Sequence, residues 1–219
     1  DDGADSAQIF TAAGYRFLHI GLQFDAPNAS LEWAASVIKA NPGLPTIIST
    51  HDYLNTEGER KANPVIDHAA VDPEDNNPEM VWEKLISQHD QIFMLLCGHQ
   101  HGQAMRVDNN KFGRKVYQVL ADYQDRHQSA IDLGAKLQQG EGIGDGWMRF
   151  MTFDFSGAVP RIVVRTYSTY YKQESAKTKE YAQWYKAGEQ PKLSDADFLA
   201  ADNFVIELTD FHARYQKPQ

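Results

Sequence analysis

Two histidines separated by a single residue form the most distinctive chemical motif of the sequence, Gly98-His99-Gln100-His101-Gly102. If the backbone stays extended, residues two apart point to the same side, so both imidazoles would leave the chain in parallel. Neutral imidazole is a common ligand of zinc, iron and manganese ions. The flanking glycines allow the backbone to bend sharply beside a bound group. The motif therefore predicts a metal site that includes His99 and His101.

A third histidine, His51, follows a short apolar segment in the same way as His99 does. In open sheets with helical connections, ligands lie beyond the carboxyl ends of the strands. We therefore expect His51, His99 and His101 to meet at one rim of a sheet as a partial metal site. We interpret the five remaining histidines as structural: His19, His68, His89, His127 and His212.

Other enzyme classes that use similar residues lack their motifs in this sequence. A site of the metallo-β-lactamase kind needs His-x-His-x-Asp, but position 103 is glutamine. The sequence contains no Gly-x-Ser-x-Gly nucleophile elbow. The glycine-rich run 140–146 lacks the Lys-Ser/Thr ending of a phosphate-binding loop. Cys97 ends an apolar segment, which favours a buried thiol over a nucleophile.

The elements that would position the three histidines alternate between strand and helix. Short apolar or alternating runs predict strands, and an apolar face that repeats every three to four residues predicts a helix. The predicted strands are 15–24, 45–50 and 91–97, and the predicted helices are 28–40 and 79–88. Two helix-then-strand units in succession favour a layered domain of sheet and helices. The polar stretch 52–77 is long enough to predict a functional loop.

The second half of the sequence predicts mainly short strands. Residues 147–155 and 159–168 alternate in hydropathy on either side of Ser156-Gly157, which is a hairpin signal. The other predicted strands are 104–108, 115–121 and 203–208, and the predicted helices are 125–138 and 172–186. Together the two halves predict a fold of the α+β class.

The charge balance limits the classes of partner. The 219 residues include 21 Lys and Arg against 30 Asp and Glu, a net charge of −9, which argues against a nucleic-acid surface and against docking on anionic lipid. The single cysteine cannot form an internal disulfide, and no apolar run is long enough to predict a membrane span. The acidic start of the sequence is unlike a signal peptide. The compartment stays open between the cytoplasm and a secreted or periplasmic location.

The order of these elements resembles the C-terminal half of the calcineurin-like metallophosphoesterases. The resemblance spans about residues 10–170 and rests on the strand ending in Thr50-His51, the strand ending in Gly98-His99-Gln100-His101, and the stretches 117–124, 144–154 and 164–168. It implies an αββα fold, a β-sandwich flanked by helices, with two divalent ions (Mn, Fe or Zn). By position, His51 and His99 would bind one ion and His101 the other. The ions would polarise a phosphate mono- or diester and generate the hydroxide that attacks phosphorus in line.

Three earlier metal motifs of that family are absent from this sequence: an early Asp-x-His, a Gly-Asp in the right order, and Gly-Asn-His. We therefore expect residues 1–170 to form the C-terminal half of a metallophosphoesterase domain, and residues 171–219 to extend it by a helix and a strand. On this hypothesis the parent protein is a metal-dependent phosphoesterase. The metal cluster of this chain alone would be incomplete and its activity weak or lost. The missing N-terminal half, or a second copy of the chain, would be its partner.

The substrate and one alternative function stay open. Tyr53, Tyr123 and Gln124 are candidate substrate contacts, but the sequence does not separate phosphomonoesters, diesters and nucleotides. The alternative is a degenerate, non-catalytic binding module of the same fold, in which the tyrosine-rich stretch 167–185 would serve a partner. Packing of those tyrosines along a strand edge is the simpler interpretation.

Overall fold

The computed structural model describes residues 3–61, 67–137 and 144–215. The chain divides into two compact units: unit 1 comprises residues 1–100, 104–120 and 210–219, and unit 2 comprises residues 101–103 and 121–209. The described residues form two separate sheets and six α-helices, which confirms the predicted mixture of helices and sheets.

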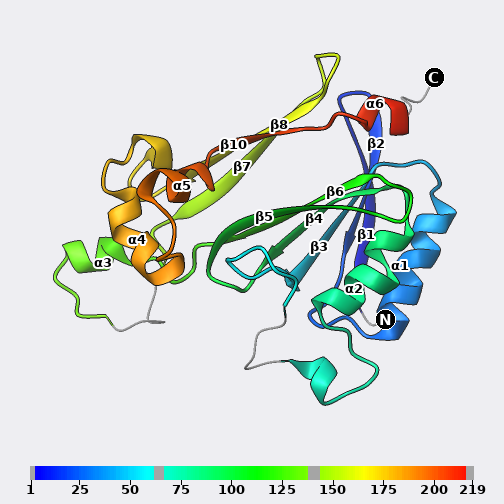
Figure 1. The fold of residues 1–219 in the computed structure, drawn as a ribbon, viewed down its shortest axis with the longest axis horizontal. Helices are drawn as coiled ribbons and strands as arrows, with labels where there is room; N and C mark the ends of the chain where they lie inside the picture. The colour runs from blue at the N-terminus through cyan, green and yellow to red at the C-terminus, as the bar shows by residue number, and fades with distance from the viewer. Residues whose placement is uncertain (1–2, 62–66, 138–143, 216–219) are drawn as a thin grey trace. The chain divides into compact units, whose positions relative to one another are not determined.

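Unit 1 is built on a six-stranded sheet with the strand order β1-β2-β3-β4-β6-β5 (Figure 1). The strands are β1 (Ser6–Ala12), β2 (Tyr15–Gly21), β3 (Thr46–Asp52), β4 (Ile92–Gly98), β5 (Gly102–Asn109) and β6 (Lys115–Asp122). Strands β2, β3, β4 and β6 are parallel to one another, and β1 is antiparallel to β2. Helix α1 (Asn28–Ala40) precedes β3 and helix α2 (Pro78–Lys84) precedes β4, so both predicted helix-then-strand units are confirmed.

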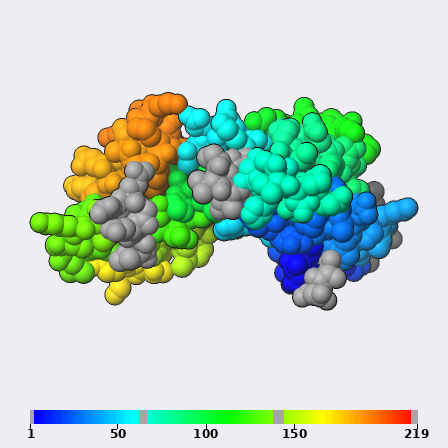
Figure 2. Space-filling model, turned by 90° about the horizontal axis from the view of Figure 1, so that it is seen from below, coloured from blue at the N-terminus to red at the C-terminus, as the bar shows by residue number. Residues whose placement is uncertain are grey.

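Helices α1 and α2 share one apolar core with the sheet. Leu31, Ala34 and Ile38 of α1 are at most 4% exposed, as the helical spacing predicts, and they belong to the same cluster as Ile20 and Ile48 of the strands. Val81 of α2 joins this cluster. Figure 2 shows the outer surfaces of the two helices, with α1 in blue next to α2 in blue-green.

Helix α6 (Phe211–Arg214), near the C-terminal end of the sequence, adds a cluster of aromatic rings to unit 1. Phe211 packs edge-on against Phe93 of β4 with ring centroids 5.3 Å apart, and it also contacts Tyr15 of β2 at 5.3 Å. The Tyr15 hydroxyl lies 2.6 Å from Nδ1 of His212. Residues almost 200 positions apart in the sequence therefore complete this cluster.

The helix starts follow the local chemistry of the chain. Asn77 caps α2 because its side chain accepts a hydrogen bond from Met80 N, and Pro78 occupies the first turn. Helix α1 begins after Pro27 without a side-chain cap. The Ser30 hydroxyl donates to the Asp5 carboxylate instead, so it is not available to the helix backbone.

Unit 2 contains the predicted hairpin, formed by β7 (Trp147–Asp154) and β8 (Arg161–Ser168). Strand β10 (Phe204–Glu207) pairs with β8, and the short β9 (Gln173–Glu174) also pairs with β8. The helices are α3 (Gln128–Asp132), α4 (Tyr181–Glu189) and α5 (Asp195–Ala200). The predicted helix over 172–186 is wrong at its start, because the chain first adds β9 to the sheet and then makes a 3-10 turn at Ser175–Lys177.

A buried guanidinium lies within the core of unit 2. Arg126 is 1% exposed and donates to both carboxylate oxygens of Glu189, at 2.7 and 2.8 Å. Its guanidinium carbon lies 4.1 Å from the ring centroid of Tyr123 and 4.6 Å from that of Tyr185. Oδ2 of the fully buried Asp202 lies 3.6 Å from Nη2 of Arg126. Such a charge is tolerated in a protein interior only because it is paired and hydrogen-bonded.

No helix in the described ranges is long and apolar enough to cross a membrane.

Arg60, a residue of intermediate exposure, connects α2 to the sheet of unit 1. Arg60, whose side chain is 5% exposed, donates to Glu79 of α2 at 2.8 Å and to Asp108 of β5 at 2.6 Å. Burial by itself would raise the pKa of Asp108, but hydrogen bonds from Arg106, Gln118 and Arg60 outweigh it and lower the pKa from 3.8 to about 2.

Asp108→Asn will therefore destabilise the protein in a pH-dependent way. Because the pKa is lower in the folded state, the carboxylate adds stability above pH 4, and this stability is lost as the pH falls towards 2. At pH 7 the variant will lose at most about 2 kcal/mol of unfolding free energy. Urea unfolding between pH 7 and pH 2 measures this, with Asp75→Asn as a control. The prediction is contradicted if the difference in unfolding free energy between Asp108→Asn and the natural sequence is the same at pH 7 and at pH 2.

Candidate functional site

The carboxyl ends of β3 and β4 bring two of the predicted ligands together. His51 is the penultimate residue of β3, and His99 follows the last residue of the neighbouring parallel strand β4. His51 Nε2 and His99 Nδ1 are 2.9 Å apart, and the ring centroids are 4.6 Å apart. His51 is exposed and His99 half-buried. The two rings thus form a solvent-accessible imidazole pair at the strand ends.

Phe24, which follows the adjacent strand β2, lies against this pair. Its ring centroid is 5.7 Å from that of His51 and 5.9 Å from that of His99. A third imidazole, His68, contacts the same phenylalanine edge-on at 5.2 Å. The interpretation of His68 as merely structural missed this grouping. The loop that carries His68 has no periodic pattern that could have indicated its position.

A buried carboxylate accompanies His68. The Asp25 side chain accepts a hydrogen bond from the His68 backbone N–H at 3.2 Å, and its Oδ2 lies 3.6 Å from His68 Nδ1. Burial raises the pKa of Asp25, and the contacts with His68 offset part of that rise. Asp25 also has a positive φ of 44°, a conformation that costs energy for a residue with a Cβ. Asp25 was not predicted; the feature of the sequence that could have indicated it is its position just beyond the end of a predicted strand.

The backbone does not stay extended through the His-x-His motif. His99 has φ +67°, in the left-handed region, and the Gln100 N–H bonds back to the Gly98 carbonyl at 2.8 Å. The prediction that the rings of His99 and His101 leave the chain in parallel assumed an extended backbone, and it is therefore wrong. The Gln100 side chain donates to the buried Asp52 at 3.0 Å, which fixes the turn to the end of β3. Strain of this kind is found preferentially at functional sites.

His101 belongs to unit 2 and pairs there with Asp125. Its Nδ1 is hydrogen-bonded to the Asp125 carboxylate. A carboxylate at one ring nitrogen fixes the proton on that nitrogen and leaves a lone pair on the other, which is the usual arrangement behind a metal-ligating histidine. The role of His101 as a ligand stays a prediction, now with a defined nitrogen, Nε2.

Asp125→Asn will remove this orienting carboxylate. We expect the neutral His101 ring to change from one dominant tautomer to a mixture, which ¹⁵N NMR of the imidazole nitrogens measures. Loss of such a partner weakens metal affinity by about 10–100-fold when the histidine is a ligand. Asp132→Asn serves as the control in the same unit. An unchanged His101 tautomer in Asp125→Asn would contradict the prediction.

The three predicted substrate contacts have different surroundings. Tyr53 is fully buried in the core of unit 1, and its hydroxyl has no hydrogen-bond partner among the residues that the structure describes. Burial raises the pKa of Tyr53 well above the usual value. Tyr123 is 8% exposed, and its hydroxyl donates to Asp202 within unit 2. Gln124 is exposed. Contact of these residues with a substrate stays a prediction.

The imidazole pair has a spacing close to the one that a single ion requires. Zinc–nitrogen bonds are about 2.0–2.1 Å long, so two bonds that meet at the tetrahedral angle hold their nitrogens about 3.3 Å apart. The 2.9 Å between His51 Nε2 and His99 Nδ1 is a hydrogen-bond distance, so the two rings would have to move slightly apart to bind one ion together. Among residues 3–61, 67–137 and 144–215, no group of three or more His, Cys, Asp or Glu side chains is arranged to hold a metal. Metal binding by the imidazole pair stays a prediction.

Comparison with known proteins leaves the family open. No protein-family model matches the sequence. The chain is 23% identical over 173 residues to an uncharacterized protein, YvnB, of Bacillus subtilis strain 168, which covers 76% of this chain and 11% of YvnB. It thus spans about a tenth of the length of that relative. Among solved structures it is similar to GAP50, the anchor in the inner membrane complex of Plasmodium, with 8% identity, a TM-score of 0.35, and coverage of 77% of this chain and 51% of GAP50.

Proposed function

We propose that this chain is part of a metal-dependent phosphoesterase of the calcineurin-like kind, which hydrolyses phosphate mono- or diesters. The observation that carries the proposal is the imidazole pair, His51 and His99, at the ends of adjacent parallel strands. In sheets of this type, ligands bind beyond the carboxyl ends of the strands. The sheet of unit 1, with α1 and α2 on it, would be one layer of the β-sandwich of this family.

In this proposal the chain contributes nitrogen donors to the site. His51 Nε2 and His99 Nδ1 would hold one divalent ion. A bound divalent ion would polarise a phosphate oxygen and lower the pKa of water to near neutrality. Asp52 and Gln100 would keep His99 in place, because they connect its turn to the end of β3. The remaining ligands would come from outside the described residues.

His68 and Phe24 lie beside that site. His68 exposes half of its side chain, and the buried Asp25 carboxylate lies 3.6 Å from its Nδ1. The Phe24 ring, which contacts all three imidazoles, would exclude water from one side of the group.

The second candidate is a binding module that has lost catalysis. It is favoured by one observation, namely that no three-donor metal group occurs within the described ranges. In such a module the imidazole pair would stay a polar surface feature with no high affinity for a divalent ion.

The experiment that separates the two is a measurement of metal binding followed by a phosphatase assay. Isothermal titration with Mn²⁺ and Zn²⁺ is carried out on the chain alone and with the protein segment encoded upstream added in trans. Hydrolysis of p-nitrophenyl phosphate and bis(p-nitrophenyl) phosphate is then followed in both samples. The proposal expects metal-dependent hydrolysis once the upstream segment is present. Absence of both metal binding and hydrolysis in the completed protein would favour the binding module.

A further inference from the structure

Strand β1 forms one edge of the six-stranded sheet in unit 1, and β2 is the only strand in the described ranges that pairs with it. All seven residues of β1 are exposed, including two large apolar side chains, Ile9 at 41% and Phe10 at 39%. An edge strand presents a row of unpaired backbone N–H and C=O groups, which can pair with a strand of another chain. The proposed phosphoesterase chemistry does not use this edge.

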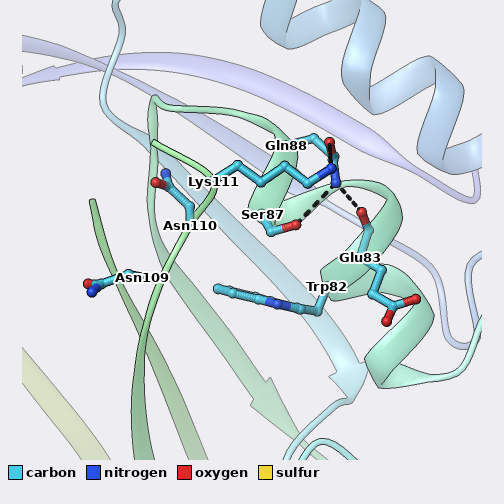
Figure 3. A pocket seen from close by; sticks show the side chains of 7 residues that line it. All are labelled: Trp82, Glu83, Ser87, Gln88, Asn109, Asn110 and Lys111. Carbon is cyan, nitrogen blue, oxygen red and sulfur yellow. Dashed lines mark hydrogen bonds between the residues drawn. The ribbon is translucent and has the colours of Figure 1, made fainter. Parts of the chain in front are cut away.

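The edge at β1 lacks the protection that the opposite edge of the sheet has. Native proteins commonly protect edge strands with charged side chains or proline, and the other edge strand, β5, contains Arg106 and Asp108. The connection after β5 is also held by α2 and its following turn, because the Lys111 backbone N–H donates to the Ser87 carbonyl at 3.1 Å and the Lys111 ammonium donates to Gln88 at 2.7 Å (Figure 3). Strand β1 contains neither a charged residue nor a proline.

The hairpin that joins β1 to β2 determines which backbone groups of β1 face the open side. Ala12 pairs with Tyr15, so the loop consists of two residues, Ala13 and Gly14. Both have a positive φ, 52° and 81°, as a type I′ turn requires. The pair that closes such a loop is hydrogen-bonded, and bonded and non-bonded pairs alternate along an antiparallel ladder. Ala12 and every second residue before it therefore bond to β2.

The intervening residues of β1 direct both their N–H and their C=O groups to the open side. These residues are Ala7, Ile9 and Thr11. The three positions are symmetric about Ile9, so an antiparallel copy of β1 with Ile9 opposite Ile9 places Ala7 opposite Thr11 and Thr11 opposite Ala7. Each outward N–H group of one strand then meets an outward C=O group of the other. The open edge is thus complementary to itself, which is what a two-fold symmetric contact requires.

The charges of the chain favour a second copy at this edge over other surfaces. With a net charge of −9, two copies repel each other over most directions of approach. Along β1 no like charges would lie opposite each other, and two Ile9 side chains would form a cross-strand apolar pair. Phe10, which stacks on Phe17 with ring centroids 5.2 Å apart, would lie opposite Gln8 of the second copy. A charged segment of another protein gains no ion pair from this strand.

We propose that the chain forms a symmetric dimer in which β1 pairs antiparallel with β1 of a second copy, centred on Ile9. The two six-stranded sheets then continue into each other across the pair. One strand pair is a small interface by the standards of stable complexes, so the dimer is weak, with a Kd of about 10–100 μM. The dimer does not depend on metal binding by the imidazole pair or on the proposed hydrolysis.

The first test is sedimentation equilibrium of the whole chain at concentrations from about 5 to about 500 μM. We expect the weight-average mass to rise from that of one chain towards that of two chains and to level off there. A mass that stays at one chain up to the highest concentration would overturn the proposal. A mass that continues to rise beyond two chains would also overturn it, because the symmetric pairing uses up the open edge.

Amide hydrogen exchange, followed by NMR, then identifies the strand that pairs. At the highest concentration the N–H groups of Ala7, Ile9 and Thr11 will exchange about fivefold more slowly than in dilute solution, because they become hydrogen-bonded in the dimer. The N–H groups of Gln8 and Phe10, which already bond to β2, will change much less. Equal slowing of both sets, or slowing of neither in a sample that dimerises, would contradict pairing through β1.

A matched pair of variants decides between the two edges of the sheet. Ile9→Lys places two like charges opposite each other at the centre of the strand pair, and it will raise the Kd about tenfold or more. Val107→Lys changes an apolar side chain of β5 that is also 41% exposed, and it will leave the Kd unchanged. Urea unfolding checks that both variants stay folded. A dimer that survives Ile9→Lys, or is weakened equally by both variants, would overturn the proposal.

The same measurements are repeated with the protein segment encoded upstream added in trans. The proposal expects the concentration dependence of the Ala7, Ile9 and Thr11 exchange rates to persist in its presence. If the segment protects these three amides and the chain stays a single copy, the open edge binds the upstream segment, and the proposal is wrong.

Discussion

On the proposed function, replacing His51 and His99 together by alanine will abolish measurable high-affinity binding of Mn²⁺ or Zn²⁺ and reduce metal-dependent phosphoester hydrolysis at least 100-fold. The expectation follows from the 2.9 Å separation of their ring nitrogens, which is close to the spacing that a single ion requires. Loss of an outer partner of a ligand already costs about 10–100-fold in metal affinity or activity, and loss of two ligands costs more. Isothermal titration and the p-nitrophenyl phosphate assay measure the two effects separately, in the sample that shows metal-dependent hydrolysis in the experiment above.

His89→Gln is the matched control for the double variant. This half-buried histidine lies before the start of β4, whereas His99 follows the end of that strand, so its substitution is not expected to affect the imidazole pair. Burial lowers the pKa of His89. The single variants His51→Ala and His99→Ala should each lose most of the affinity, because one remaining nitrogen is a weak ligand. If the double variant keeps the metal affinity of the natural sequence, the metal is bound elsewhere and the proposed function loses its supporting observation.

Arg126→Ala will destabilise unit 2 by about 3–5 kcal/mol, the usual cost of removing one partner from a buried charge pair. The substitution leaves Glu189 without its bidentate partner and removes the contacts of the guanidinium with the rings of Tyr123 and Tyr185. The loss approaches the full stability of many domains, so partial unfolding at room temperature is expected. Urea unfolding followed by fluorescence measures it, since Trp147 and Trp184 both belong to unit 2.

Two further variants make the result specific to the buried network. Arg165→Ala removes an exposed arginine that pairs with Glu174 at 3.1 Å, and it should cost at most about 1 kcal/mol. Arg126→Lys keeps the charge but cannot bond to both oxygens of Glu189, so an intermediate loss is expected. Equal effects of Arg126→Ala and Arg165→Ala would contradict the assignment of a central role to Arg126.

The parallel part of the fold could be predicted because its elements have strong local signals. The apolar runs that became β3 and β4 and the helical spacing in α1 reflect burial by the sheet, and burial dominates sequence patterns. Strand β1 was not predicted because all seven of its residues are exposed, so no alternation marks it. The start of α4 was misjudged because pairing of β9 with β8 decides the structure of residues 173–174, and that pairing is not local.

The candidate site was predictable only in part. Sequence placed His51 and His99 after apolar strands, and parallel pairing brings such positions together. The contacts of Phe24 with His68, and of His68 with Asp25, join a strand end to a distant loop, and no local pattern reports them. The left-handed turn at His99 was also missed, because glycines on either side of a motif allow a bend without specifying which residue adopts it.

The path of the chain through the two units constrains the order in which the molecule is completed during translation. Residues 121–209 belong to unit 2, and Phe211 and Tyr215 then return to pack on Phe93 in unit 1. Until those last aromatic residues emerge from the ribosome, the nascent sheet leaves the rings of Phe17 and Phe93 open on that side. Contacts between such distant positions slow folding and prolong the exposure of apolar surface. That apolar side of the sheet therefore stays uncovered by Phe211 and Tyr215 for as long as residues 121–209 are being synthesised.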